Sequence, residues 1–409
     1  MRYLLTQVSV LLVLQIVTAE SAAINGTPSW TPSIIDDLSG SFFVSSPDLA
    51  FDHFGTPSVS WSSVQQPSGT NSVRLSRLGG LGFWSTQTLA TGPDIGLQTG
   101  ISFDRSERAT VAWINGSGAV SASFDGGPNL AAGAGAAVTA PVITLSHDLE
   151  GSLRGMFART SPGGTSEISF DGTAFGSADL MSFSGVAMLM DAAMVADGRG
   201  LRQIVARVEL SAGSEAVMAA SEAPGGGPWS SGSLFTANTV SGVDIAVDPG
   251  DGNVAVAYST FDGVNTSKLF FAKFNGFAME TTEVRSSTQH RFEDLSLAFD
   301  LADGLPAIAV EHKDIGLGQD QLALIYQDGA MIWQTSIIDS AISFDAPGGL
   351  QRRPSLAFDD FGTSFPAVAY VDNDEVLTVA FDPPVPEPST VMLILSAAAL
   401  IGFTQRRMR

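Results

Sequence analysis

The sequence predicts an all-β fold, a single β-propeller that most simply has seven four-stranded blades. The first observation behind this prediction is a short motif ending in aspartate that recurs about every fifty residues. The second is that the segments between the copies read as further short strands, without sustained helical periodicity. The 43 glycines add support, because a propeller needs many turns between short strands.

The repeated motif is a short apolar strand that ends in aspartate, followed by a turn and a second apolar strand. It reads DLAFDHFGTPSVSW at residues 48–61 and SLAFDDFGTSFPAVAY at residues 355–370. The copies that begin near residues 144 and 193 are degenerate. The shared aspartates are 44 to 59 residues apart, and they are Asp52, Asp104, Asp148, Asp197, Asp248, Asp300 and Asp359.

Each unit also contains a third strand, such as KLFFAKF at residues 268–274, and a fourth segment that usually opens with an aromatic residue. The segment near Leu130 lacks its aromatic. A blade of four such strands has apolar faces that only neighbouring blades can cover, so the units must stack around a closed ring. The aromatic residues that open the fourth segments are Trp30, Trp84, Phe175, Trp229, Phe277 and Trp333.

The repeat frame also predicts how the ring closes. Residues 30–35 precede the first copy of the motif, whereas the last unit ends at Phe381 with no fourth segment after it. We therefore expect residues 30–35 to form the outermost strand of the last blade. The alternative architecture is a pair of β-sandwich domains with a boundary near residues 224–228, and the regular aspartate spacing across that point disfavours it.

Composition excludes several functions. The chain has no cysteine, so it can form neither a disulfide nor a thiolate metal site, and it has no cysteine nucleophile. Its formal net charge of -22 repels phosphate backbones, so nucleic acid is not expected as a partner. The same charge is compatible with divalent cations or a cation-bridged matrix.

The N-terminal residues are typical of a secretory signal peptide. Arg2 precedes an apolar run at residues 8–17, and small residues follow at Ala19 and Ala23. The run is too short for a membrane-spanning helix, which needs about 20 residues. We therefore predict a signal peptide at residues 1–23.

The C-terminal residues form a three-part tail. Pro386, Glu387 and Pro388 precede an uncharged run at residues 391–403, which is also shorter than a full membrane span. The tail then ends in a cluster of arginines. The length and charge of this tail are also compatible with a weak membrane anchor or a buried core helix. The arginines are Arg406, Arg407 and Arg409.

This order of parts resembles the PEP-CTERM sorting domain. The resemblance implies a sorting helix within residues 383–409, which an exosortase, a membrane-embedded cysteine protease, recognises before the tail is removed near the Pro-Glu-Pro. It further implies an exported protein of a Gram-negative bacterium that makes exopolysaccharide and biofilm. Such a protein would be held transiently at the inner membrane through the helix before it reaches the cell surface or matrix. The resemblance says nothing about the activity of the body at residues 24–382.

The strongest metal candidate is the loop DPGDGN. Its Asp248, Asp251 and Asn253 offer the oxygen ligands that calcium prefers. The structural interpretation is that each repeat aspartate accepts backbone N–H bonds in a tight turn while glycine supplies a positive φ. Recurrence in every unit favours the structural interpretation, so calcium at this loop is the alternative prediction, and we expect no other cofactor.

No catalytic motif is present: the sequence contains no H-E-x-x-H, no G-x-S-x-G and no P-loop. We therefore predict a binding or structural protein without enzymatic activity, whose partner is a polysaccharide or a surface protein. The alternative is an extracellular hydrolase or lyase that acts on glycans at an acidic site in the mouth of the central channel.

Overall fold

The structure is a computed structural model that describes residues 29–382. The predicted signal peptide and sorting segment lie outside these residues. Short internal segments are also not described, namely 38–41, 45–46, 66–68, 81, 94, 97, 116, 135–142, 148–152, 159–163, 171–174, 211–212, 225–226, 276–277, 316–318, 343–352, 360–364 and 373.

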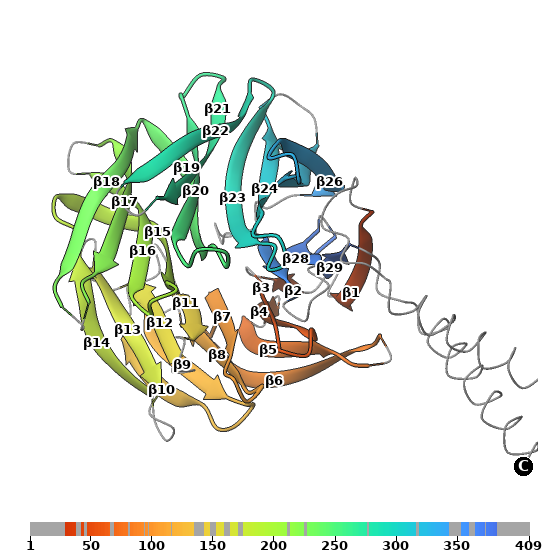
Figure 1. The fold of residues 1–409 in the computed structure, drawn as a ribbon. Coiled ribbons are helices and arrows are strands. Elements are labelled where there is room, and N and C mark those ends of the chain that lie inside the picture. The colour runs from red at the N-terminus through yellow and green to blue at the C-terminus, as the bar shows by residue number, and fades with distance from the viewer. Residues whose placement is uncertain are drawn as a thin grey trace, which may run out of the picture.

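The described strands form seven antiparallel sheets set around a common centre, as a β-propeller (Figure 1). No helix occurs among the described residues. The strands of the first three sheets are β2 (Phe42–Val44), β3 (Asp48–Phe51), β4 (Pro57–Gln65), β5 (Thr70–Leu78), β6 (Trp84–Pro93), β7 (Gln98–Phe103), β8 (Ala109–Ile114), β9 (Ala119–Phe124), β10 (Leu130–Ala134), β11 (Ile143–His147), β12 (Leu153–Ala158), β13 (Gly164–Phe170) and β14 (Phe175–Ser182).

The strands of the next three sheets are β15 (Val186–Ala196), β16 (Arg202–Leu210), β17 (Glu215–Glu222), β18 (Trp229–Ala237), β19 (Thr239–Val247), β20 (Val254–Phe261), β21 (Ser267–Phe274), β22 (Met279–Ser287), β23 (His290–Phe299), β24 (Pro306–Asp314), β25 (Asp320–Gln327) and β26 (Trp333–Ile342). The last sheet combines β27 (Ser355–Phe358), β28 (Pro366–Val371) and β29 (Val376–Phe381) with β1 (Thr31–Asp37). Each sheet is named below by its innermost strand: β3, β7, β11, β15, β19, β23 or β27.

The β3 sheet has a fifth strand because its inner edge is interrupted. β2 and β3 pair end to end with the same strand, β4, and Pro47 lies between them. A proline cannot donate a ladder hydrogen bond, so it marks a break in the strand. In the other described sheets, one innermost strand pairs with the second strand.

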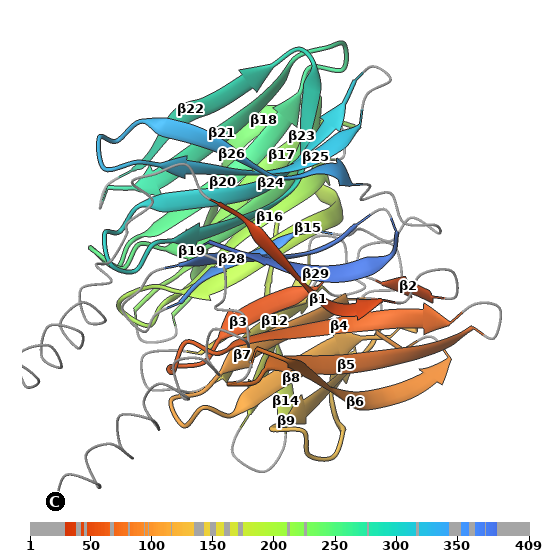
Figure 2. The ribbon, with the colours of Figure 1, turned by 90° about the vertical axis from the view of Figure 1, so that its right-hand side faces the viewer.

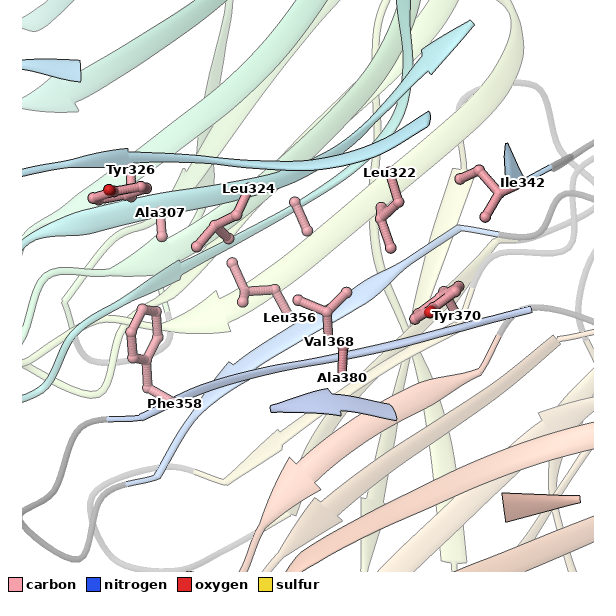
Figure 3. Packing of buried hydrophobic residues seen from close by; sticks show 11 residues of the cluster. Ala307, Leu322, Leu324, Tyr326, Ile342, Leu356, Phe358, Val368, Tyr370 and Ala380 are labelled. Atoms are coloured by element: carbon pink, nitrogen blue, oxygen red, sulfur yellow. The ribbon is translucent and has the colours of Figure 1, made fainter. Parts of the chain in front are cut away.

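The innermost strands contact each other in chain order, and β27 contacts β3 again, so the ring is closed. Clusters of buried hydrophobic side chains fill the gaps between neighbouring sheets throughout the described part of the chain. Figure 3 shows the cluster in which Leu322 and Leu324 of the β23 sheet pack against Leu356 and Val368 of the β27 sheet. Both faces of each blade are therefore covered by its neighbours, as the repeat predicts.

The predicted closure is confirmed. β1 pairs antiparallel with β29, with Thr31 opposite Phe381, and it is the outermost strand of the last sheet (Figure 2). The Ser33 hydroxyl accepts a hydrogen bond from the Trp84 indole at 2.9 Å, and Arg74 pairs with Asp36 at 2.9 Å. β1 therefore contacts both the last sheet and the β3 sheet.

The predicted fourth strands also occur. β6, β14, β18 and β26 begin at the aromatic residues that open these segments in the sequence, and β10 begins at Leu130. Phe277 lies outside the described residues, and the fourth strand there begins at Met279. The alternative of two β-sandwich domains does not occur, because one ring includes sheets on both sides of residues 224–228.

A disulfide across the closing strand pair should stabilise the ring. Pro32 lies opposite Ala380, and the native chain has no cysteine that could mispair. We expect P32C/A380C to form a disulfide and to raise the free energy of unfolding by about 2–4 kcal/mol, since it closes most of the chain into a loop. Urea denaturation with and without reductant measures this gain.

The control is P32C/V379C, in which the second cysteine points to the opposite face of the strand. This pair should not crosslink under the same oxidant. Efficient crosslinking of the control, or none in P32C/A380C, would contradict the register of the closure.

Candidate functional site

The repeat aspartates hold turns. The Oδ1 atom of Asp52 accepts the backbone N–H groups of Phe54 and Thr56, at 3.0 and 2.8 Å. The first turns of the β7, β15, β19 and β23 sheets repeat such bonds, so these aspartates hold turns as the structural interpretation predicts. Glycine supplies the positive φ in these turns except in the β7 sheet, where Glu107 has a φ of 63°. Asp148 lies outside the described residues.

A second set of polar side chains, at the first position of the motif, ties neighbouring innermost strands together. Asp48 accepts the backbone N–H of Ile101 at 2.8 Å, and Asp244 accepts that of Leu297 at 2.7 Å. We call these inter-sheet hydrogen bonds the latches. Further latches run from Leu356 to Ser296 and from Leu49 to Ser355. The latch from Ile143 is accepted by Gln98, which lies two residues before the first position of its motif.

Sequence reasoning did not assign this role, although a polar residue opens several copies of the motif. The signal was weak because the position varies. The degenerate copies carry Thr144 and Ala193 there; the Oγ1 atom of Thr144 is buried without a hydrogen-bond partner, and Ala193 has no polar group.

Arg353 joins four sheets at the centre of the ring. It precedes β27, and its guanidinium donates to Asp191 of the β15 sheet at 2.7 Å. It also donates to the carbonyl oxygens of Val243 and Leu295, at 2.9 and 3.0 Å. One largely buried cation therefore satisfies acceptors from the β15, β19 and β23 sheets at once.

A cavity of about 210 Å³ lies beside Arg353, and each innermost strand contributes to its wall. Its polar lining includes Asp48, Asp244, Ser296 and Ser355. Burial raises the pKa of Asp48 and of Asp244 to about 6, although the charge of Arg353 opposes the shift in both. The carboxylates are thus engaged in latches while they face the cavity.

A larger cavity, of about 520 Å³, lies between the β15 and β19 sheets; we call it the interblade pocket. At its mouth Arg199 pairs with Asp197 at 2.6 Å, and the Arg199 side chain is 64% exposed. Glu222 lines the pocket and accepts two hydrogen bonds from Arg202, which lower the pKa of that carboxyl. The apolar wall includes Val254, Val256, Phe274 and Met279.

Two glycines bring the turns of these sheets together. The backbone N–H of Gly198 donates to the carbonyl of Gly252 at 2.9 Å. A Cβ atom on Gly198 would lie 2.7 Å from the Gly252 Cα, so neither turn could approach so closely with a larger residue. Gly252 also has a φ of 69°, a conformation that favours glycine. This contact places Arg199 and Asn253 beside the same cavity.

The predicted calcium loop lies at the edge of the interblade pocket. Asp248 accepts the backbone N–H of Gly250 at 2.7 Å, and Asp251 accepts that of Asn253 at 2.9 Å. The ammonium of Lys273 pairs with both carboxylates, at 3.0 Å in the case of Asp251. No cluster of three or more potential metal ligands of the His, Cys, Asp or Glu type occurs among the described residues. Calcium binding here stays a prediction.

The sorting residues lie outside the described part of the chain, so their assignment rests on sequence. Residues 384–409 match the family model of the PEP-CTERM protein-sorting motif. The chain carries this motif. Within the described residues, no helix is long and apolar enough to cross a membrane. The motif makes this an exported protein that an exosortase processes.

Solved structures share the fold. The BP39L lectin from Burkholderia pseudomallei matches with a TM-score of 0.60 and 13% identity, over 85% of this chain and 99% of the lectin. A Dyadobacter fermentans protein of unknown function matches with a TM-score of 0.53 and 9% identity, over 87% of this chain and 99% of that protein. The Hadza microbial sialidase Hz136 matches with a TM-score of 0.48 and 11% identity, over 83% of this chain and 66% of the sialidase. No curated protein matches the chain. The matches to the lectin and to the Dyadobacter fermentans protein establish similarity of fold alone.

Removing Arg353 should destabilise the ring. In R353M, Asp191 keeps a buried charge without its partner, and the carbonyls of Val243 and Leu295 lose a donor. Breaking a buried pair in this way costs about 3–5 kcal/mol. Urea denaturation measures the loss. The exposed Arg105 provides the control, since R105M should change stability by no more than about 0.5 kcal/mol. Equal effects of the two variants would contradict the central role of Arg353.

Replacing Asp244 should have a pH-dependent effect. The folded state raises the pKa of this carboxyl to about 6, so it binds the proton more tightly than the unfolded chain does. The stability that this group contributes is therefore full below about pH 4 and is lost as pH rises to about 6. D244N carries no charge, and its asparagine oxygen can still accept the latch from Leu297.

We expect D244N to be more stable relative to the parent at pH 7.5 than at pH 4.5. Thermal melts of both proteins at both pH values measure how the stability difference between D244N and the parent changes with pH, and groups that do not interact with Asp244 cancel in this comparison. The control is D303N at an exposed aspartate. A D244N effect that is equal at both pH values would contradict the cost of ionising Asp244.

Proposed function

We propose that this chain is an exported binding protein of the cell surface or extracellular matrix, and that it binds glycan in the interblade pocket. The observation that carries the proposal is the composition of that pocket: fixed charged groups at the mouth and an apolar wall that includes Phe274 and Met279. A sugar ring presents hydroxyl groups at its edge and C–H groups on its faces, and both kinds of surface find a partner there.

The charged groups are already oriented for hydrogen bonding. Arg199 is held by Asp197, and Glu222 is held by Arg202, whose guanidinium lies 5.7 Å from the centre of the Trp229 ring. Groups that are fixed before the ligand arrives lose less entropy on binding. One solved structure of similar fold is a lectin, which makes glycans the first ligand class to test.

The ends of the chain supply the location. We propose a signal peptide at residues 1–23, a body at residues 24–382 in which each described sheet is one of seven blades, and a sorting segment at residues 383–409. Pro386, Glu387 and Pro388 would mark the processing site, and Arg406, Arg407 and Arg409 would stay on the cytoplasmic side. The host would be a Gram-negative bacterium, with exopolysaccharide or biofilm as the setting.

The alternative is a glycan hydrolase or lyase at the central cavity. Asp48 and Asp244 face that cavity with raised pKa values, as a general acid would require. Both carboxylates, however, already accept hydrogen bonds from backbone N–H groups of the next sheet. We therefore favour binding without catalysis.

Glycan binding should depend on Arg199. In R199A the pocket loses its exposed guanidinium, and the affinity for a glycan found on an array of polysaccharide fragments should fall roughly tenfold. The matched control is R108A, because Arg108 pairs with Asp104 at 2.7 Å in the equivalent turn of the β7 sheet but does not line the pocket. Titration calorimetry of residues 24–382 gives both affinities.

Equal losses in the two variants would contradict the placement of the site. Turnover of a polysaccharide by the parent, with no retention of glycan, would favour the alternative. Repeating the titration with calcium and with a chelator tests the prediction at Asp248, Asp251 and Asn253.

A further inference from the structure

Both ends of the body leave the molecule at the same place. Thr31 lies opposite Phe381, and the backbone N–H of Ser29 donates to Asp382 at 3.0 Å. In the β27 sheet, Phe381 lies beside Ala367 and therefore at the end that carries the turn after the repeat aspartate. We call the side of the ring with these turns the aspartate face. The sorting motif begins at residue 384 and so continues from this face.

Exposed hydrophobic side chains lie on the two sheets that flank this exit. On the aspartate face, the large exposed hydrophobic residues of the described chain all come from the β3 and β23 sheets, which flank the β27 sheet on its two sides. Phe54 is 70% exposed and Phe83 is 66% exposed. We call this group the apolar rim; it comprises Phe54, Phe83, Leu301, Met331 and Ile332.

One member of the apolar rim is held in an unfavourable backbone conformation. Met331 has a φ of 62°, in the left-handed region that favours glycine or asparagine. In the corresponding turn of the β3 sheet this position is Gly82, with a φ of 77°. A methionine here costs conformational energy and exposes 64% of an apolar side chain to water. The φ closes the turn, because the Met331 N–H donates to the Asp328 carbonyl at 2.8 Å, but the turn does not need an exposed apolar side chain. That side chain points to a contact outside the fold.

The length of the linker identifies what the rim can reach. Eight residues separate Asp382 from the apolar run that begins at Val391, and an extended chain across those nine Cα–Cα steps spans at most about 30 Å. When the run is in a membrane, the exit side of the aspartate face is thus the part of the body nearest to the lipid. We propose that the apolar rim docks onto the lipid bilayer while the sorting tail is still attached.

This contact would be driven by apolar burial rather than by charge. The net charge of -22 disfavours anionic lipid, and exposed aromatic and methionine side chains at turn tips can enter the headgroup region without disturbing the fold. The body would then lie with its aspartate face on the membrane until the tail is removed. The inference rests on the membrane step of the proposed function, but not on glycan binding.

Site-specific fluorescence on the full chain tests the proposal. Because the chain has no cysteine, F83C and V264C each accept one polarity-sensitive dye. Val264 is 76% exposed in the turn between β20 and β21, on the opposite face. The labelled chains are mixed with zwitterionic phosphatidylcholine vesicles that contain a spin-labelled lipid. We expect quenching of the dye at position 83 to be at least threefold stronger than at position 264, and to persist in high salt.

A second pair of variants separates docking from folding. M331N should keep or raise the melting temperature, because asparagine tolerates this φ, and together with F54S it should reduce quenching at position 83 at least twofold. I315S, on the opposite face, should leave quenching unchanged.

Equal quenching at positions 83 and 264, or no effect of F54S/M331N, would overturn the proposal. So would a failure of the full chain to float with vesicles, since the tail would then not hold the body at a membrane. No glycan is present in any arm, so these outcomes are independent of the pocket.

Discussion

Closure of the ring by one strand pair is the constraint on which the rest of the structure depends. A four-stranded sheet with two apolar faces is not stable alone, and each sheet here is covered only when both neighbours are in place. Among the described strands, the first in the chain is the outermost strand of the last sheet, so β1 must reach β29 to complete the circle. Without disulfides, the pairing and the contacts of Ser33 and Asp36 with the β3 sheet hold this junction.

The centre of the ring raises a different problem, because innermost strands that converge there bring polar backbone groups together. The latches and Arg353 satisfy many of these groups with side chains. An acidic chain uses aspartate for part of this work, and burial then raises the pKa of Asp48 and Asp244. A raised pKa near a cavity is often taken as a sign of catalysis, but here the same carboxylates have a structural task.

The sequence allowed the fold to be predicted because its signals repeat. One repeat of about fifty residues predicted three features: the aspartate turns, the fourth strands that open with an aromatic residue, and the closure of the last sheet by the first strand. Arg353 could not be predicted in this way, since it lies outside the motif and its acceptors come from three distant sheets. The latches were missed because no single residue type recurs. The acceptor is aspartate or serine at the first position of the motif, and in one unit it is a glutamine two residues earlier.

The interblade pocket was also not predictable, and the reason is informative. Its walls come from two sheets, with lining residues on β16, β17 and β18 of one and on β19, β20, β21 and β22 of the other, and the first of these sheets belongs to a degenerate unit. In that unit Ala193 replaces the latch residue, and the backbone contact of Gly198 with Gly252 joins the turns instead. Structural positions recur in every unit because every blade needs them. A residue that differs from its counterparts in the other units and also lines a cavity is not needed to build a blade. Arg199 is such a residue.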